Sequence, residues 1–502
     1  MKIFLIGHDY KYAVEQMLLT LFPNDQYEYS TETDLTQSDD AVKRLDDCDT
    51  GSFESCLILN GKHYAQAITI IRREGLEGRG TARISHAALN DKLTTDRLLQ
   101  RIIKISFYRA ALHFIKTPPV WGALTGIRPA KLAAAELEAG KSHKATASAL
   151  TKTYYVSPDR AKLCTDAALV SLDVNKTLDV RDIALYVGIP FCPTRCDYCS
   201  FVSNSVERSF DLIEPFTAQL LEEIEAAAEL LRSLNLRVVS IYIGGGTPTA
   251  LPADSLERIM SAIGRLFDLR HIREYTVEAG RPDTITREKL DIIARHGADR
   301  VCVNPQSMNP VVLEAIGRAH TPEEITRSVR EARSAAMSVN MDIIAGLPKD
   351  TPQGFADTLT QVLAMRPENI TIHTLSLKKG SKLMLSGTDI PGGAEVAEML
   401  ENASPRLRDS GYRPYYLYRQ KFISGGFENV GWSLPGAEGL YNIIMMEELR
   451  TVIAVGGGGV TKLVLPTGRI ERIFNAKFPR EYVLQSEKTS DKMVRIRELL
   501  RI

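Results

Sequence analysis

A regular alternation of short apolar runs and longer helical stretches, between residues 182 and 377, constrains the fold more than any other feature. Short β-rich runs that alternate with helical segments are the sequence form of repeated parallel βα units. The predicted strands are Ile183–Ile189, Val238–Ile243, Tyr275–Glu278, Arg300–Asn304, Val339–Ile344 and Ile370–Thr374. We therefore expect an α/β fold whose centre is a partial (β/α)6 barrel. In such a barrel the active site lies at the carboxyl ends of the strands.

The regions on either side of these units predict further domains, because a chain of 502 residues exceeds what one hydrophobic core usually holds. Strand-like runs at Ile3–Ile6, Cys56–Asn60 and Ala67–Ile71 indicate an α+β segment near the start. We predict a small α+β domain over 1–95, a helical region over 96–178, the barrel over 179–377 and a C-terminal α+β domain over 378–502 that covers the substrate.

Three of the seven cysteines fall close together after the first barrel strand, at Cys192, Cys196 and Cys199. A four-iron four-sulfur cluster normally takes four protein ligands, so a set of three thiolates leaves one iron open to a small molecule. One alternative is a zinc site, although structural zinc prefers four ligands. The other alternative is three unrelated buried cysteines.

The Cys-x3-Cys-x2-Cys spacing resembles the signature of the radical S-adenosylmethionine (SAM) enzymes. In that superfamily the amino and carboxylate groups of SAM chelate the fourth iron. The resemblance implies a 4Fe-4S cluster and SAM as cofactors. It also implies that Cys192, Cys196 and Cys199 ligate the metal and are essential to catalysis.

Polar residues follow or lie within the next predicted strands. The turn Gly244–Thr249 comes after the second strand, Glu278 ends the third, Gln306 follows the fourth and Asp342 lies inside the apolar fifth. Each of them, considered alone, has an alternative role in a tight turn or in capping and tying a loop. A buried acid needs a partner, and parallel strands bring their carboxyl ends together. Their joint placement therefore favours a binding site.

A narrower resemblance rests on several segments taken together. The segments Tyr186–Cys192, Gly244–Thr249, Ile316–His320 and Asp342–Pro348 resemble the oxygen-independent coproporphyrinogen III dehydrogenase family over about residues 180 to 380. The stretches Trp121–Lys131 and Glu428–Trp432 are similar to a long branch of that family, which carries an extra N-terminal domain.

This resemblance implies roles for individual residues. Tyr186 would face the SAM carboxylate and Tyr198 the adenine, and Gly245, Gly246 and Thr247 would hold the amino group. The residues implied for the rest of the cofactor are Glu278, Gln306, Arg318, Asp342 and Ser376.

The stretch from Tyr412 to Tyr441 is rich in aromatic residues. Its aromatic residues are Tyr412, Tyr415, Tyr416, Tyr418, Phe422, Phe427, Trp432 and Tyr441. They could wall a flat macrocycle, with Arg413, Arg419 and Lys421 meeting propionates, since guanidinium pairs well with carboxylate. The alternative is a β-rich core with exposed cations.

The sequence departs from the family at one informative position. The best-known dehydrogenases have a cysteine two residues after the third ligand, where this chain has Phe201. The haem-chaperone branch also has phenylalanine there. Those chaperones, however, carry a His-Asn pair before Tyr-Trp, whereas Asn429 here follows Glu428.

The resemblance implies an enzyme of anaerobic haem biosynthesis that converts coproporphyrinogen III to protoporphyrinogen IX by two oxidative decarboxylations. The alternatives are a haem chaperone, or another radical reaction on a tetrapyrrole such as methylation or ring opening. The expected partners are a tetrapyrrole and an electron donor such as flavodoxin or ferredoxin.

Charge and hydropathy set expectations about location and partners. Lys plus Arg and Asp plus Glu both total 62, so no global basic field predicts nucleic-acid binding. No export signal or apolar run of membrane-spanning length stands out. We expect a cytoplasmic protein.

Overall fold

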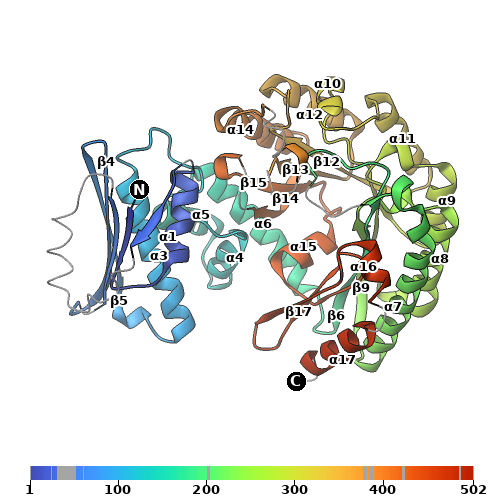
Figure 1. Cartoon of the computed structure of the whole chain (residues 1–502), viewed down its shortest axis with the longest axis horizontal. Helices are drawn as coiled ribbons and strands as arrows, with labels where there is room; N and C mark the ends of the chain where they lie inside the picture. Colours follow the sequence, from blue (N-terminus) through green and yellow to red (C-terminus); the bar gives the residue numbers. More distant parts are fainter. Residues whose placement is uncertain are drawn as a thin grey trace. The chain divides into compact units, whose positions relative to one another are not determined.

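The computed structural model describes residues 2–23, 25–30, 52–59, 61–199, 204–376, 381–383, 389–420, 424–485 and 488–500. These residues form two compact units (Figure 1). The first comprises residues 1–127 and 140–163, and the second comprises residues 128–139 and 164–502. The predicted helical region 96–178 is thus divided between the units.

The first unit is a five-stranded sheet with helices. Its strand order is β2-β1-β3-β4-β5, with β1, β2 and β3 parallel and the others antiparallel. The strands are β1 (Lys2–Ile6), β2 (Glu28–Ser30), β3 (Ser52–Ile58), β4 (Tyr64–Arg73) and β5 (Leu76–Ser85), and the helices are α1 (Lys11–Leu21), α3 (Lys92–Ala111) and α5 (His143–Tyr154).

The core of this unit lies between the sheet and helices α1 and α3. Within it, Phe53 and Phe107 pack with tilted rings whose centroids are 4.4 Å apart. The three strands predicted here are confirmed, whereas β5 was not predicted. Its alternate residues are buried, but three of these four are Gly or Ala, which carry little apolar signal.

The second unit contains an eleven-stranded sheet in the order β14-β15-β13-β12-β11-β10-β9-β6-β16-β17-β18. The seven central strands, β13, β12, β11, β10, β9, β6 and β16, are all parallel to their neighbours within this group. Strands β14, β15, β17 and β18 at the two edges pair antiparallel. The strands are β6 (Asp182–Ile189), β9 (Arg237–Gly245), β10 (Glu274–Glu278), β11 (Arg300–Cys302), β12 (Ser338–Ala345), β13 (Asn369–Thr374), β14 (Arg413–Arg419), β15 (Glu428–Ser433), β16 (Val452–Gly456), β17 (Val460–Val464) and β18 (Ile470–Phe474).

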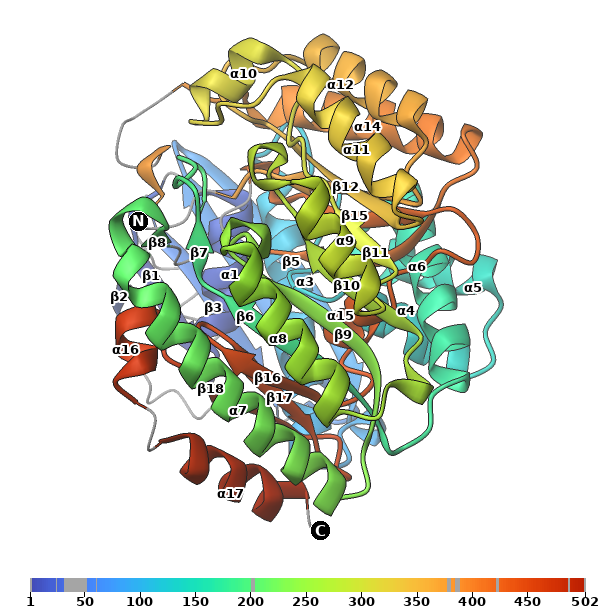
Figure 2. The same ribbon diagram turned by 90° about the vertical axis from the view of Figure 1, so that its right-hand side faces the viewer.

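Helices connect the parallel strands and cover the outside of the sheet, where α7, α8, α9, α11 and α12 follow one another (Figure 2). The helices of this unit are α4 (Ala130–Glu138), α6 (Pro158–Lys176, whose first residues belong to the first unit), α7 (Ile213–Ser233), α8 (Ala253–Leu266), α9 (Arg287–Arg295), α10 (Pro310–Ala315), α11 (Pro322–Ser334), α12 (Pro352–Met365), α14 (Gly393–Asp409), α15 (Leu440–Glu447), α16 (Pro479–Val483) and α17 (Lys488–Leu500).

The predicted α/β fold class is confirmed, since all six predicted barrel strands occur as neighbouring parallel strands. The C-terminal segment extends this same sheet at both edges. Strands β14 and β15 pair beyond β13, and β16 pairs with β6 at the opposite side. The segment therefore contributes to the walls around the carboxyl ends of the parallel strands.

Candidate functional site

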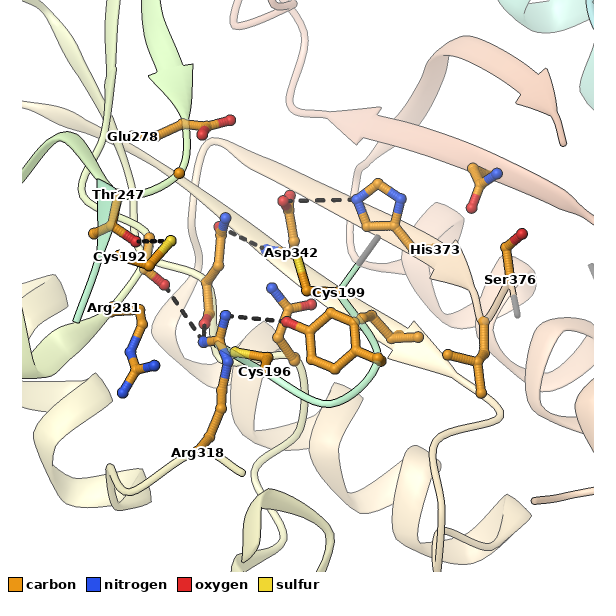
Figure 3. A pocket seen from close by; sticks show the side chains of 18 of the residues that line it. Cys192, Cys196, Cys199, Thr247, Glu278, Arg281, Arg318, Asp342, His373 and Ser376 are labelled. Atoms are coloured by element: carbon orange, nitrogen blue, oxygen red, sulfur yellow. Dashed lines mark hydrogen bonds and ion pairs between the residues drawn. The ribbon is translucent and has the colours of Figure 1, made fainter. Parts of the chain in front are cut away.

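A pocket lies at the carboxyl ends of the parallel strands (Figure 3). Among the predicted site residues, all except Tyr186 line it. The lining residues are Cys192, Thr194, Cys196, Tyr198, Cys199, Gly245, Gly246, Thr247, Glu278, Gly280, Arg281, Asn304, Gln306, Arg318, Asp342, Ile344, His373, Thr374, Leu375, Ser376, Tyr418, Gln420 and Asn429. One pocket thus brings together residues from distant parts of the sequence.

The three cysteines enter the pocket from the loop after β6. Cys192 ends the short strand β7 (Phe191–Cys192), which pairs with β8 (Asn204–Ser205), and the hydroxyl of Thr247 donates to its Sγ at 3.5 Å. The backbone N–H of Cys199 donates to the carbonyl of Cys196 at 3.1 Å. These contacts hold all three thiols at one end of the pocket. Phe201, the residue that departs from the family, lies outside the described residues.

Arg281 holds the same cysteine loop in place. The sequence did not predict Arg281 as a site residue. Its guanidinium is 3 % exposed and donates to Thr194 Oγ1 at 2.7 Å and to both carboxylate oxygens of Asp283. Because Thr194 lies between the first two cysteines, Arg281 fixes the shape of the loop that presents them.

Arg318 lies beneath the cysteine loop. Its guanidinium donates to the carbonyl of Asn304 at 2.6 Å and to the hydroxyl of Tyr198 at 3.1 Å, and its charge interacts with the thiol of Cys196. Its Nε has no partner among the described residues. A buried cation beside a thiol stabilises the thiolate, which is the form that ligates metal.

The glycine turn after β9 is bound to the cysteine strand. The N–H groups of Gly246 and Thr247 donate to the carbonyls of Ile189 and Phe191, both at 2.7 Å. A Cβ on Gly246 would lie 2.4 Å from the carbonyl oxygen of Phe191, and Gly245 has φ +108°. Only glycine allows this approach, which places the turn beside the cysteines.

Glu278 extends into the pocket from the end of β10. Its carboxylate accepts the hydroxyl of Tyr242 at 2.5 Å and the N–H of Gly245 at 3.2 Å. Burial raises its pKa to about 7, despite the hydrogen bond from Tyr242. The residue can therefore accept or release a proton near neutral pH.

Asp342 lies on β12 at the middle of the pocket. Burial alone would raise its pKa, but His373, Asn340 and Thr371 together leave it below the usual value, so it stays ionised. Gln306 joins it through a backbone hydrogen bond of 2.9 Å to the Asp342 carbonyl. Gln306 has φ +65° and its side-chain Oε1 has no partner among the described residues, so it remains available to a ligand.

Tyr186 is partly buried in a stack of tyrosine rings next to the glycine turn. Its ring centroid lies 6.3 Å from that of Tyr242 and 6.0 Å from that of Tyr441. A Cβ on Gly245 would lie 3.0 Å from the Tyr186 hydroxyl. The hydroxyl therefore supports the glycine turn from below.

The aromatic stretch divides between core and pocket. Tyr418 lines the pocket, and six other aromatic residues, Tyr412, Tyr415, Tyr416, Phe427, Trp432 and Tyr441, are at most 5 % exposed. Arg413 pairs with Glu438 at the surface and Arg419 is buried. Lys421 and Phe422 lie outside the described residues. These six therefore belong to the core, as the alternative states, although Tyr441 lies on helix α15 and Arg419 is buried where exposed cations were expected.

The donor set fits an iron–sulfur cluster with an attached polar ligand. Three thiols offer the soft ligands that such clusters take. The unpaired donor on Arg318 and the unpaired acceptor on Gln306 offer hydrogen bonds to a polar group beside them. Among the described residues, no three His, Cys, Asp or Glu side chains converge as a single-ion site would require.

Comparison with known proteins agrees with this arrangement. Residues 186–362 match the radical SAM superfamily. The oxygen-independent coproporphyrinogen-III oxidase-like protein HemZ of Bacillus subtilis is 39 % identical over 387 residues, covering 75 % of this chain and 77 % of the relative. The haem chaperone HemW of Haemophilus influenzae is 28 % identical over 305 residues, covering 60 % of this chain and 76 % of the relative.

A solved structure shares the fold. The coproporphyrinogen III oxidase HemN of Escherichia coli, described as a radical SAM enzyme, superposes with a TM-score of 0.51 at 22 % identity. The match covers 64 % of this chain and 72 % of HemN. It supports the predicted radical SAM barrel.

The fold and the cysteine-lined pocket define a radical SAM protein. The predicted 4Fe-4S cluster and SAM are the cofactors of that superfamily, and this prediction is confirmed. Within the superfamily, the chain belongs to the HemZ family of oxygen-independent coproporphyrinogen-III oxidase-like proteins. No described helix is both long enough and apolar enough to cross a bilayer.

Proposed function

We propose that this protein converts coproporphyrinogen III to protoporphyrinogen IX by two oxidative decarboxylations. The observation that carries the proposal is the single pocket that holds three cysteines at one end and residues of the C-terminal strands at the other. Tyr418 and Asn429 belong to those strands, which supports the proposal that the C-terminal segment covers the substrate.

Within this pocket, different residues would bind the cluster and SAM. Cys192, Cys196 and Cys199 would ligate the cluster. The residues that would hold SAM are Tyr186 behind the glycine turn, Tyr198, Gly245, Gly246, Thr247, Glu278, Gln306, Arg318, Asp342 and Ser376. When bound, the cluster and SAM supply abstraction of a hydrogen atom from an unactivated carbon.

The chain itself contributes positioning and exclusion of water. Arg281 and Arg318 hold the cysteine loop, and Glu278 holds the glycine turn through the Gly245 N–H. Most of these groups are buried, so they need little reorganisation when ligands bind. Each decarboxylation would remove one hydrogen atom and release carbon dioxide, with the remaining electron passing to an external acceptor. A flavodoxin or ferredoxin would supply electrons to the cluster.

One residue argues against the haem-chaperone alternative. Glu428 stands where chaperones carry the histidine of a His-Asn pair. Its side chain is 3 % exposed and does not line the pocket, and its charge acts on the buried Arg419. A buried carboxylate in this position offers haem no imidazole ligand.

The experiment that tests the proposal is an anaerobic incubation of the reconstituted protein with SAM, a reductant and coproporphyrinogen III. We expect stepwise loss of two carboxyl groups by mass spectrometry, together with 5′-deoxyadenosine. Cys196→Ala protein serves as the control without activity. Cofactor cleavage with coproporphyrinogen left intact would overturn the proposed substrate, and stoichiometric haem binding without turnover would favour a chaperone.

A further inference from the structure

Several pocket residues lie outside the predicted cofactor set, and four of them, His373, Tyr418, Gln420 and Asn429, come from strands β13, β14 and β15 or the residue after β14. The sheet order places β13 and β15 beyond β12, away from β6 and its cysteine loop. In Figure 3, His373 lies on the far side of Asp342 from Cys192 and Thr247. These residues therefore form a second end of the pocket, which a substrate rather than the cluster would meet.

His373 is oriented by the carboxylate beside it. Its Nε2 lies 3.6 Å from Oδ2 of Asp342, and the imidazole side chain is 28 % exposed. Its other nitrogen, Nδ1, makes no hydrogen bond within the described part of the chain. An ionised Asp342 favours a proton on Nε2, so the opposite edge of the ring is free to contact a ligand.

Asn429 presents a buried donor that no other described residue satisfies. Its Oδ1 accepts the backbone N–H of Thr374, the residue after His373, at 2.9 Å, and this contact fixes the amide. The residue is 1 % exposed and lines the pocket, yet its Nδ2 has no partner among the described residues. An unsatisfied buried donor is unfavourable, and a bound acceptor would remove that cost.

Acidic and basic side chains both line the pocket, and a single basic residue of the described lining, His373, lies at this end beside Asp342. Among the described lining residues, Arg281, Arg318 and His373 are those that can carry positive charge. Arg281 is engaged by Asp283, and Arg318 by the carbonyl of Asn304, by Tyr198 and by Cys196. This leaves His373 as the described basic lining residue that an acidic substrate group can approach.

We propose that His373 and Asn429 form a carboxylate-binding subsite that holds one propionate of the tetrapyrrole substrate. A protonated imidazole with Nε2–H toward Asp342 presents Nδ1–H, and Asn429 presents Nδ2–H. Two donors on neighbouring strands match the two oxygens of a carboxylate. The inference rests on the proposed tetrapyrrole substrate, but it concerns binding rather than turnover.

The sharpest test is Asn429→Asp. This variant keeps the shape and the acceptor for the Thr374 N–H, but it replaces the free donor with a negatively charged oxygen. Asn309→Asp is the matched control, because Asn309 caps α10 through its Oδ1 and aspartate caps a helix equally well. Iron content and SAM affinity of both variants report whether the fold and the cluster end remain intact.

The measurement is binding of coproporphyrin III and of its tetramethyl ester to the reconstituted protein, followed by fluorescence. We expect the acid to bind at least about tenfold more tightly than the ester, and Asn429→Asp and His373→Gln to remove most of that difference. Asn309→Asp should bind both ligands as the wild type does.

Equal affinity of the wild type for acid and ester would overturn the subsite, as would unchanged acid affinity in Asn429→Asp. Discrimination between acid and ester without turnover of coproporphyrinogen would instead count against the proposed reaction and leave the subsite in place.

Discussion

The hydroxyl of Tyr242 donates a 2.5 Å hydrogen bond to Oε1 of Glu278, and this contact lies between adjacent strands at the edge of the pocket. The other carboxylate oxygen holds the N–H of Gly245, so one buried acid links the floor of the pocket to its glycine turn. Glu278 therefore supports the glycine turn from the neighbouring strand.

Stability should depend on pH through Glu278. Burial raises its pKa from 4.5 to about 7, so the folded state favours the protonated carboxyl. The stabilisation is complete below pH 4.5 and is lost as pH rises through 7. Between pH 5 and 8, the free energy of unfolding of the cofactor-free wild type should fall by about 2–3 kcal/mol relative to Glu278→Gln.

Urea unfolding followed by the fluorescence of Trp432 measures this difference in the second unit, in a Trp121→Phe background that removes the other tryptophan. If the free energies of unfolding of the wild type and Glu278→Gln change with pH in the same way between pH 5 and 8, the raised pKa of Glu278 is contradicted.

Loss of one cysteine ligand should abolish cluster binding. Cys196→Ala removes a thiol that lies beside Arg318, and two remaining thiols do not hold a four-iron cluster stably. We expect iron and acid-labile sulfide to fall to background after anaerobic reconstitution. Cys164→Ala is the control, because Cys164 is buried outside the pocket, and it should retain the cluster. A cluster-bearing Cys196→Ala protein would contradict the assigned ligand set.

Even the charge-preserving substitution Arg318→Lys should weaken SAM binding. Lysine keeps the charge but loses the planar fork that donates to Asn304 and Tyr198 together. Lost hydrogen bonds to a charged group cost about 1.5–3 kcal/mol, so SAM affinity of Arg318→Lys should fall roughly 10- to 100-fold. Titration calorimetry measures the dissociation constant. Arg287→Lys, an exposed change, should leave it unaltered, and an equal dissociation constant in Arg318→Lys would refute the role.

Much of the barrel could be predicted from sequence because its strands are continuous apolar runs. Val339–Ile344 was predicted and Ser338–Ala345 is observed, a difference of one residue at each end. The edges of the sheet could not be predicted in the same way. The pairing of Gly456 with Gly188 joins residues 268 positions apart, and no local pattern specifies such a register.

The candidate site could likewise be predicted only in part. Glu278 and Asp342 could be found because carboxylates in or after apolar strands are unusual and need partners. His373 lies within a predicted strand, but the pattern of a strand buried on both faces does not reveal which side chains enter a pocket. Asn429 lies on β15, which pairs antiparallel with β13. This pairing joins segments distant in sequence, so no local pattern predicts that Asn429 reaches the pocket.

The C-terminal helix should be essential to stability through one buried ion pair. Nζ of Lys492 on α17 donates to Oε1 of Glu223 on α7 at 2.8 Å, and the two side chains are 7 % and 2 % exposed. The same carboxylate accepts the N–H of Gly456 at 2.7 Å and the hydroxyl of Tyr482 at 2.6 Å. It thereby holds the turn at Gly456, which pairs with Gly188 shortly before the first cysteine.

Lys492→Met leaves this carboxylate buried without a countercharge, and the free energy of unfolding should fall by about 3–5 kcal/mol. Adding Glu223→Gln removes the unpaired charge and should recover part of the loss, which gives a coupling between the two positions in a double-mutant cycle. Urea unfolding followed by Trp432 fluorescence measures the free energy of unfolding of the wild type, the two single variants and the double variant. Lys488→Met, an exposed change on the same helix, should shift the free energy by less than about 0.5 kcal/mol. Strictly additive effects of the two substitutions would show that the pair does not bind the helix to the barrel.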